Sequence, residues 1–466
     1  MNGTLLQRLN GVVRAAPALL IAFFVLGAFA LMVVDPSWDS LSYSTWQVGW
    51  EQGRIARNLV RGLGYESPFL ALPGDNFLCS PPGDEDAGIV NPALQEERPG
   101  SQPTAWVTPP YVLLWVGAFL LFGVYTPASA AAFTVGQIAL MAVALVLAWR
   151  LVQRLRGART ALLALALLVF YPSTWWFAVE DTHGEALFLV FLIGTLFTLE
   201  RLLAGARGPW LVLHALGVAL AVLTEPVTLF FYLWLEAWVA FRVLPERTGD
   251  KRQGLRLLAA SALASALVIG PWLVRNLVVL GAPIPFKSNL PMEIYYGNNE
   301  DSAWNLHLAH VRRFPAWNEE ERLRLLAVGE PAYGKRCLLQ AAIFLHEHPL
   351  TVVRLTLQRI SYVWSYNPFR TTTWRPALTL LFHLALGFWA AALLLLGRRR
   401  DWFDHACCAF LALFPVIYYV THFMIYRYRY PLEAVLLLGT AAAWGRLAGW
   451  TAAPKNGPAA DITTAT

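Results

Sequence analysis

The sequence predicts an all-α integral membrane protein. Of its 466 residues, 57% are hydrophobic and only 14% are charged, whereas charged residues make up about 25% of a soluble domain. Apolar runs recur along the chain, and most approach the roughly 20 residues that a helix needs to cross a bilayer. We therefore expect about ten membrane-spanning helices in one polytopic domain, 1–452, followed by a disordered cytoplasmic tail, 453–466.

Ten apolar runs are the predicted spans. The first, 15–34, follows Arg8 and Arg14 and contains a cleavage-like Ala-Phe-Ala, but its apolar character continues beyond that point. It is therefore interpreted as a retained span and not as a cleaved signal peptide. The other nine are 128–149, 160–178, 185–200, 209–223, 227–242, 257–277, 376–396, 405–423 and 430–448.

An eleventh apolar run, 107–124, determines the predicted orientation. If this run crossed the membrane, the arginine cluster at 150–159 would face outwards, although arginine and lysine are concentrated in cytoplasmic loops. If the run lies in or along the outer leaflet, every basic cluster falls on one side. We adopt this second arrangement, which puts both termini in the cytoplasm and the protein in the inner (plasma) membrane of a cell. Two long segments, 35–127 and 278–375, then face outwards.

A short helix is predicted soon after the first span, in the stretch "WEQGRIARNLVRGLGYESPF". Its apolar residues recur at helical spacing over 51–63, and Arg54, Arg57 and Arg61 share a different face. This pattern is typical of a helix that lies in the plane of the membrane surface. Glu51 falls in the first turn, where the helix dipole favours an ionised carboxylate. The alternative is that Glu51 is an ordinary N-terminal helix acid paired with Arg54.

The second outward segment is more polar than the rest of the chain. It predicts three amphipathic helices, 319–326, 333–346 and 349–364, of which the first is capped by Asn318. Because the segment is short and lies between spans, we expect it to pack as a lid on the outer face and not as an independent domain.

Three polar residues in apolar surroundings have separate interpretations. Glu236 is costly in lipid and must therefore be paired or neutral. His214 is interpreted as a hydrogen-bonded core residue. Glu225, in "LTEPV", marks a tight turn between two short apolar runs, and its carboxylate either faces a cavity or serves the turn.

The sequence establishes no cofactor. It contains no zinc-binding spacing, phosphate-binding loop or dinucleotide fingerprint, and the net charge of +6 requires no nucleic-acid partner. A metal site formed by Asp181, His183 and Glu185 is an alternative, but side chains at alternate positions in a turn seldom converge unaided, so the metal is left unassigned. Cys79 and Cys337 both fall in outward segments, and their pairing is left open because the sequence does not determine their distance.

Five segments resemble, in their order along the chain, the motifs of a known family. They are "WEQGRIARNLVRGLGYESPF", "PTAWVTPPYVLLW", "AVEDTHGEALF", "GPWLVRNLVVLGAPIPFKSNLPMEIYYGNN" and "HFMIYRYRYPLEAV". The family is the GT-C class of polytopic membrane glycosyltransferases, in particular the bacterial branch related to the aminoarabinose transferase of lipid A, the protein O-mannosyltransferases and the lipopolysaccharide-core galacturonosyltransferases. The resemblance implies a GT-C-like bundle with in-plane helices in the first outward loop and a helical outward segment.

The resemblance also implies an activity. Such enzymes transfer a sugar from a polyprenyl-phosphate donor to an extracytoplasmic acceptor, here a lipid, a glycan or a protein. Glu51 stands where the family has its catalytic acid, so we expect it to be the general base. Asp181 is expected to orient the acceptor or assist Glu51, with Glu180 as its substitute. A single base with no general acid implies direct displacement with inversion, unlike the carboxylate pair of glycosidases.

Cations must stabilise the charge that grows on the leaving phosphate. The resemblance implies four candidates, Arg275, Lys287, Arg427 and Arg429. For the first two, the alternative is that they snorkel at the outer end of a span. For the last two, the alternation with tyrosines in "YRYRY" is also typical of an interfacial anchor.

The chain departs from the family pattern in its acidic residues and in one basic residue. The family has Asp, often Asp-Glu, where this chain has Glu51 followed by Gln52. Asp39 therefore remains a rival for the base, and Glu225 an alternative acid. Thr108 stands where the aminoarabinose branch has a lysine before Pro-Pro.

Two other functions compete with glycosyl transfer. A lipid or glycan flippase or another transporter is the first, but such proteins usually contain internal repeats and helices broken at mid-bilayer, and no repeat is found here. A catalytically inactive scaffold for envelope assembly is the second, and it remains open because Glu replaces Asp at the first acid.

Overall fold

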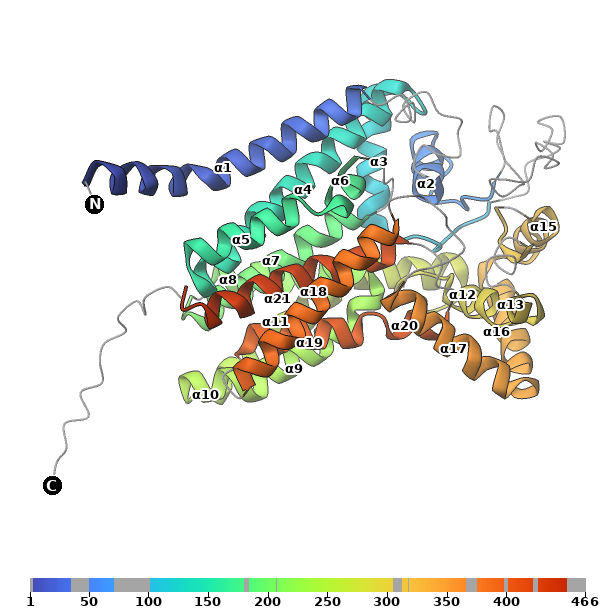
Figure 1. The fold of residues 1–466 in the computed structure, drawn as a ribbon. Coiled ribbons are helices and arrows are strands. Elements are labelled where there is room, and N and C mark those ends of the chain that lie inside the picture. The colour runs from blue at the N-terminus through green and yellow to red at the C-terminus, as the bar shows by residue number, and fades with distance from the viewer. Residues whose placement is uncertain are drawn as a thin grey trace.

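The computed structural model describes residues 3–34, 50–70, 101–179, 184–206, 208–304, 312–316, 318–365, 375–397, 401–421 and 426–450. Within these ranges the secondary structure is helical, apart from one isolated bridge between Glu66 and Pro103 (Figure 1). The prediction of an all-α fold is therefore confirmed.

Seven helical segments in the described part of the chain are long and apolar enough to cross a membrane. The first is the apolar part, Ala15–Val34, of α1 (Gly3–Val34). The others are α4 (Pro127–Arg156), α7 (Glu185–Leu203), the continuous stretch Pro226–Thr248, α11 (Lys251–Leu280), Ala377–Leu396 within α18 (Arg375–Leu396), and Trp402–Val420. The stretch Pro226–Thr248 comprises η3 (Pro226–Thr228), α9 (Leu229–Trp238), η4 (Val239–Val243) and α10 (Leu244–Thr248), and Trp402–Val420 comprises α19 (Trp402–Leu413) and α20 (Val416–Val420).

An eighth predicted span is broken. The run 160–178 forms α5 (Ala158–Val169) and α6 (Pro172–Val179), which meet at an angle of 61°. Pro172 explains the break, because its ring has no N–H to continue the ladder of α5 and disfavours helical geometry in the residue before it.

The two remaining predicted spans form helices that are not among these candidates. The run 209–223 forms α8 (Pro209–Thr224), whose 16 residues make a helix of about 24 Å. The run 430–448 forms α21 (Tyr430–Leu447), which is buried almost throughout and so meets other helices rather than lipid. The described chain therefore has seven or eight candidate spans where ten were predicted.

The helices separate into a bundle and an outward group. In Figure 1, α1 begins and α21 ends at the same end of the bundle. The opposite end carries α2 (Trp50–Val60), α3 (Pro109–Phe122), α12 (Leu290–Gly297), α13 (Glu300–Trp304), α15 (Glu319–Val328), α16 (Glu330–Glu347) and α17 (Pro349–Trp364).

The outward helices agree with the predicted segments. The three expected over 319–326, 333–346 and 349–364 are α15, α16 and α17, and the Asn318 side chain accepts a hydrogen bond of 2.9 Å from the backbone N–H of Glu321, as predicted. The amphipathic interpretation of α2 is wrong in one respect, because Arg54 and Arg57 are buried and do not form a basic surface. Arg57 instead donates to the side chain of Asn58 and to the carbonyl of Leu70.

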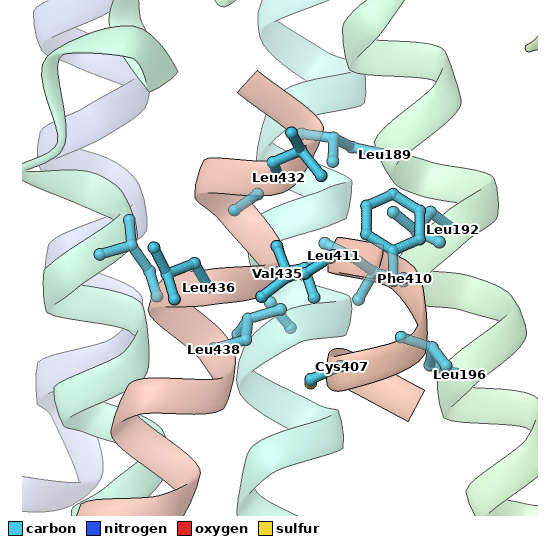
Figure 2. Packing of buried hydrophobic residues seen from close by; sticks show 14 of the residues in the cluster. Leu189, Leu192, Leu196, Cys407, Phe410, Leu411, Leu432, Val435, Leu436 and Leu438 are labelled. Atoms are coloured by element: carbon cyan, nitrogen blue, oxygen red, sulfur yellow. The ribbon is translucent and has the colours of Figure 1, made fainter. Parts of the chain in front are cut away.

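The bundle core is apolar and closely packed. Figure 2 shows side chains of α7, α19 and α21 meeting in its centre, among them Leu192, Phe410 and Val435. Close contact also depends on glycine, since a Cβ atom at Gly445 would lie 2.2 Å from the hydroxyl of Thr160 on α5.

Glu236 and His214 meet inside the bundle. The Nε2 atom of His214 lies 2.8 Å from a carboxylate oxygen of Glu236, and the Ser261 hydroxyl donates to the other oxygen at 2.8 Å. Glu236 is thus paired and His214 is a hydrogen-bonded core residue, as the sequence predicted. These contacts join α8, α9 and α11, and they satisfy a carboxylate that would be costly in lipid.

Candidate active site

A pocket opens at the end of the bundle that carries α2 and α3, where segments distant in the sequence converge. The space between its lining residues is about 540 Å³, including open solvent. Its walls come from α2, the start of α3, α7, the end of α8, the loop after α11, and the chain around α20 and α21. One residue from each of these places is Gln52, Tyr111, Glu185, Glu225, Lys287 and Tyr418.

The pocket brings together two of the residues predicted from the sequence. The Nζ atom of Lys287 lies 3.9 Å from a carboxylate oxygen of Glu225, and the two side chains are 28% and 22% exposed. Glu185 adds a second carboxylate from the first turn of α7, where the helix dipole favours negative charge. The lining thus contains one lysine and two acids.

The rest of the lining includes polar and aromatic residues. Gln52, Thr108 and Thr224 supply groups that can hydrogen-bond to hydroxyls. Tyr418 and Tyr428 stack with their ring centroids 4.6 Å apart and contribute apolar surface. A ligand with a hydroxyl-rich head and an apolar portion would find both kinds of partner here. The sequence alone does not show that these residues meet, because they lie in separate segments.

The loop that carries Lys287 is anchored on both sides of the lysine. Before it, the indole N–H of Trp272 donates to the carbonyl of Phe286 at 2.8 Å, and the Asn276 amide donates to the carbonyl of Ile284 at 2.8 Å. After it, the N–H of Ser288 donates to the carbonyl of Ala105 at 2.8 Å. Trp272 and Asn276, which belong to the motif "PWLVRN", therefore fix the position of Lys287.

Glu330 joins the two segments 35–127 and 278–375 to each other. It is 3% exposed and accepts hydrogen bonds from the backbone N–H of Ala105 at 2.8 Å, from the Ser288 hydroxyl at 2.6 Å, and from the Thr104 hydroxyl. Burial raises the pKa of Glu330, and the three hydrogen bonds and nearby Arg275 oppose this rise. The sequence did not reveal this role, because an acid at the start of a helix looks like a simple dipole partner.

Glu51 lies beside the pocket wall. The indole N–H of Trp106 donates to a carboxylate oxygen of Glu51 at 2.6 Å. Trp106 is fully buried against Phe69, with ring centroids 4.7 Å apart, so it holds the carboxylate in a fixed place. The residues that follow each partner in the chain, Gln52 and Val107, both line the pocket.

Arg275 does not line the pocket. Its guanidinium donates to the carbonyls of Thr104 at 2.5 Å and Tyr65 at 2.9 Å, and it lies over the rings of Tyr65 and Trp272. These contacts tie α11 to the first outward segment.

Arg429 is likewise engaged within the protein. It is buried, donates to Glu433 at 2.8 Å and to the carbonyl of Ser365 at 3.0 Å, and lies over the ring of Phe382. The backbone of Arg427 belongs to the short helix η6 (Tyr426–Arg429), whereas its side chain lies outside the described residues.

Several predicted residues lie outside the described part of the chain, namely Asp39, Glu180, Asp181, His183 and Cys79. Within the described part, no three His, Cys, Asp or Glu side chains are placed to hold a metal ion.

Cys337 is a buried thiol on α16, and burial raises its pKa to about 12. Because Cys79 lies outside the described residues, their pairing stays open.

Comparison with known proteins identifies the fold. No protein-family model matches the chain, and no curated protein matches it. Its structure is similar to that of the oligosaccharyltransferase AglB from Archaeoglobus fulgidus in complex with an inhibitory peptide and a dolichol-phosphate, with a TM-score of 0.53 and 13% identity over 93% of this chain and 50% of AglB. The apo form gives a TM-score of 0.51 and 15% identity over 92% and 50%.

A third similar structure is that of ArnT from Cupriavidus metallidurans bound to undecaprenyl phosphate, with a TM-score of 0.38 and 15% identity over 92% of this chain and 78% of ArnT. AglB is a GT-C glycosyltransferase, so the predicted resemblance to that class is confirmed for the fold. The chain spans about half the length of AglB.

Proposed function

We propose that this protein is a membrane glycosyltransferase that transfers a sugar from a polyprenyl-phosphate donor to an extracytoplasmic lipid, glycan or protein. The observation that carries the proposal is the pocket, whose lining contains Lys287 paired with Glu225, a second acid, Glu185, and two stacked tyrosines, and beside which lies the carboxylate of Glu51. This set of groups suits a lipid-linked phosphosugar, and it lies in a GT-C-like fold.

Lys287 is the proposed ligand of the donor phosphate. It is a compact charge on a flexible stem, and its anchored loop keeps that stem at the pocket. A bound phosphate would replace Glu225 as its partner, and Lys287 would then stabilise the charge on the departing polyprenyl phosphate. Arg427 is the proposed second cation, since Tyr428 next to it lines the pocket.

Glu51 is the proposed general base, which takes the proton of the acceptor hydroxyl as that oxygen attacks the sugar carbon with inversion. Trp106 orients the carboxylate. Asp181 is the proposed partner that orients the acceptor, with Glu180 as its substitute, because Gly184, three residues beyond Asp181, lines the pocket. Asp39 and Glu225 are the rival acids, and Glu225 is itself part of the lining.

Arg275 and Arg429 receive a different role from the one that the motifs implied. They contact backbone carbonyls, aromatic rings, Asn276 and Glu433. We assign both to positioning, Arg275 for the first outward segment and Arg429 for the start of α21.

The proposed topology has ten spans, including α8 and α21, and both termini lie in the cytoplasm. The proposed membrane is the inner (plasma) membrane of the cell. The arginine-rich turn that joins α4 to α5 lies at the end of the bundle opposite the outward helices, and α10 lies at the same end (Figure 1). Arginine and lysine concentrate on the cytoplasmic side, which supports an outward-facing site.

A transfer assay tests the proposal. The purified protein in lipid nanodiscs is given radiolabelled polyprenyl-phosphate hexose, aminopentose or uronic acid together with envelope lipids, glycans and peptides. We expect label to move to one acceptor class with release of polyprenyl phosphate, and the Glu51→Gln variant to lose this transfer. Movement of an intact polyprenyl lipid across vesicles without sugar transfer would instead identify a flippase. A protein that does neither would be a scaffold.

A further inference from the structure

Helix α17 exposes an apolar face. Leu350, Val353 and Leu357 recur at intervals of three and four residues, and Leu350 and Leu357 are 84% and 61% exposed. The opposite face, which includes Leu355 and Arg359, is buried. The helix is therefore amphipathic, but it exposes its apolar face, whereas a helix in contact with water exposes its polar face.

The apolar face continues onto α16. His348 directly joins the two helices, as the residue that ends α16 and precedes the first turn of α17. Leu339 and Ile343, four residues apart and so on one side of α16, are exposed. An exposed apolar surface of this extent on an outward segment is typical of a binding site for a partner or a membrane.

Helix α15, in the same segment, differs in the charges that it exposes. Glu319 and Glu320 are exposed there together with Leu323 and Val328. The exposed surface of α15 therefore carries acids beside its apolar residues.

The orientation of α17 indicates which apolar environment its exposed face meets. In Figure 1, α17 lies across the direction of α18 and projects from the bundle, and it is not parallel to the spans. Its last turn is docked on the bundle, where the indole N–H of Trp364 donates to the Tyr419 hydroxyl at 2.8 Å and Arg359 donates to the carbonyl of Tyr419. The next helix in the chain, α18, is a candidate span with Leu380 exposed, so a surface suited to lipid resumes directly after this segment.

The exposed charges on the same helices are mostly positive. Lys335, Arg336 and Arg354 are exposed, against one exposed acid, Glu347. Basic residues beside an apolar helix face favour anionic lipid headgroups.

We propose that α17 and the part of α16 from Lys335 onwards form a membrane-contacting surface, which we call the paddle. Its apolar face, Leu339, Ile343, Leu350, Val353 and Leu357, inserts among the headgroups and upper acyl chains of the outer leaflet, and Lys335, Arg336 and Arg354 contact anionic headgroups. The paddle supports the outward segment on the lipid surface beside the pocket, and it does not depend on the proposed enzymatic activity.

Fluorescence quenching tests the paddle. The full chain, with Cys79 and Cys408 replaced by Ser and Ala, carries a bimane label at Leu350→Cys or Leu357→Cys and is placed in nanodiscs with 30% phosphatidylglycerol. The matched control is Glu320→Cys on α15. We expect brominated phospholipid to quench the two α17 labels at least twofold more than the control, and aqueous iodide to show the opposite order. We also expect Arg354→Gln, or discs of phosphatidylcholine alone, to weaken the lipid quenching.

Either of two results would overturn the proposal. Labels on α17 that respond to iodide as strongly as the α15 control would place the face in water. Labels shielded from both quenchers would mean that protein, such as a second copy of the chain, covers the face. The substituted leucines are exposed, so the variants are expected to fold, and unchanged thermal unfolding of each labelled protein verifies this.

Discussion

The indole nitrogen of Trp106 lies 2.6 Å from a carboxylate oxygen of Glu51, and the two residues come from different parts of the first outward segment. The same two stretches supply Gln52, Val107 and Thr108 to the pocket. A hydrogen bond from a fully buried indole restricts the carboxylate to one position. Such fixed placement is what a general base requires, because proton transfer depends on a short, well-oriented contact.

Replacing Glu51 with Gln should abolish most transfer. The amide keeps the size of the side chain but cannot take a proton, and general-base catalysis typically contributes about 10²- to 10⁴-fold. We expect a fall of that order in kcat with little change in thermal stability. Trp106→Phe should cost less, roughly fivefold, since it removes one hydrogen bond of about 1 kcal/mol. Glu319→Gln, an exposed acid on α15, is the matched control. Full activity in Glu51→Gln would move the base to Asp39 or Glu225.

Lys287 and Glu225 should affect donor binding in opposite directions. Lys287→Met removes the proposed phosphate ligand, so we expect KM for the polyprenyl-phosphate donor to rise about tenfold. Glu225→Gln removes a carboxylate that competes with the phosphate for Lys287, so KM should fall. Both side chains are partly exposed and their charges 3.9 Å apart, so the pair contributes about 1 kcal/mol at most, or roughly fivefold in KM.

The control for this pair is Lys251→Met, which removes an exposed lysine at the start of α11 away from the pocket. Donor KM is measured at low and high salt, because screening should reduce the effect of Glu225→Gln. If Glu225→Gln instead abolished transfer at unchanged donor binding, Glu225 would be a catalytic acid.

The sequence predicted those parts of the fold that depend on local patterns. Hydrophobic length located the spans, and the amphipathic period and the N-cap at Asn318 located α15. The motif order of a family supplied the long-range information that implied Lys287 as a phosphate ligand, whereas Glu225 was a candidate only from its turn in "LTEPV". The run 160–178 predicts one span, but Pro172 within it breaks the helix.

The roles of individual arginines and acids could not be predicted in the same way. In sequence, a phosphate-binding arginine, a snorkelling arginine and a buried brace look alike, and Arg57, Arg275 and Arg429 are tied to protein groups. Glu330 reaches Ala105 across 225 positions of sequence, and no local period records such a contact. Only the folded chain distinguishes these cases.

Glu330 should make the protein less stable as the pH rises. Burial raises its folded-state pKa above that of an unfolded glutamate, about 4.3. The protonated form therefore stabilises the fold fully below about pH 4.3, and this contribution is lost as the pH rises through the folded-state pKa. We expect Glu330→Gln, which stays neutral, to lose this part of the pH dependence of the melting temperature. Glu330→Ala should be destabilised at every pH, because Thr104, Ala105 and Ser288 lose their acceptor. A Glu330→Gln melting curve that tracks the wild type across pH would contradict the raised pKa.

Gly297 should not tolerate a side chain. A Cβ atom there would lie 2.8 Å from the backbone oxygen of Thr421, and Arg359 also donates to the Gly297 carbonyl. We expect Gly297→Ala to lower the free energy of unfolding by about 1–3 kcal/mol, measured by thermal unfolding in detergent. Gly136→Ala, in α4 with no atom within 4 Å of the added carbon, should be neutral or slightly stabilising. Equal effects of the two substitutions would mean that the contact with Thr421 is not tight.

The site should face away from the cytoplasm. Cysteine is introduced at Glu246 in α10 or at Glu320 in α15, both exposed, in a chain with Cys79→Ser and Cys408→Ala. Intact cells are treated with a maleimide that reaches the outer face but does not cross the inner membrane. We expect the label at position 320 in intact cells and at position 246 only after lysis, because the basic clusters near α10 hold that end in the cytoplasm. Labelling at position 246 alone in intact cells would reverse the orientation. The pocket would then face the cytoplasm and not the extracytoplasmic side where we propose that transfer occurs.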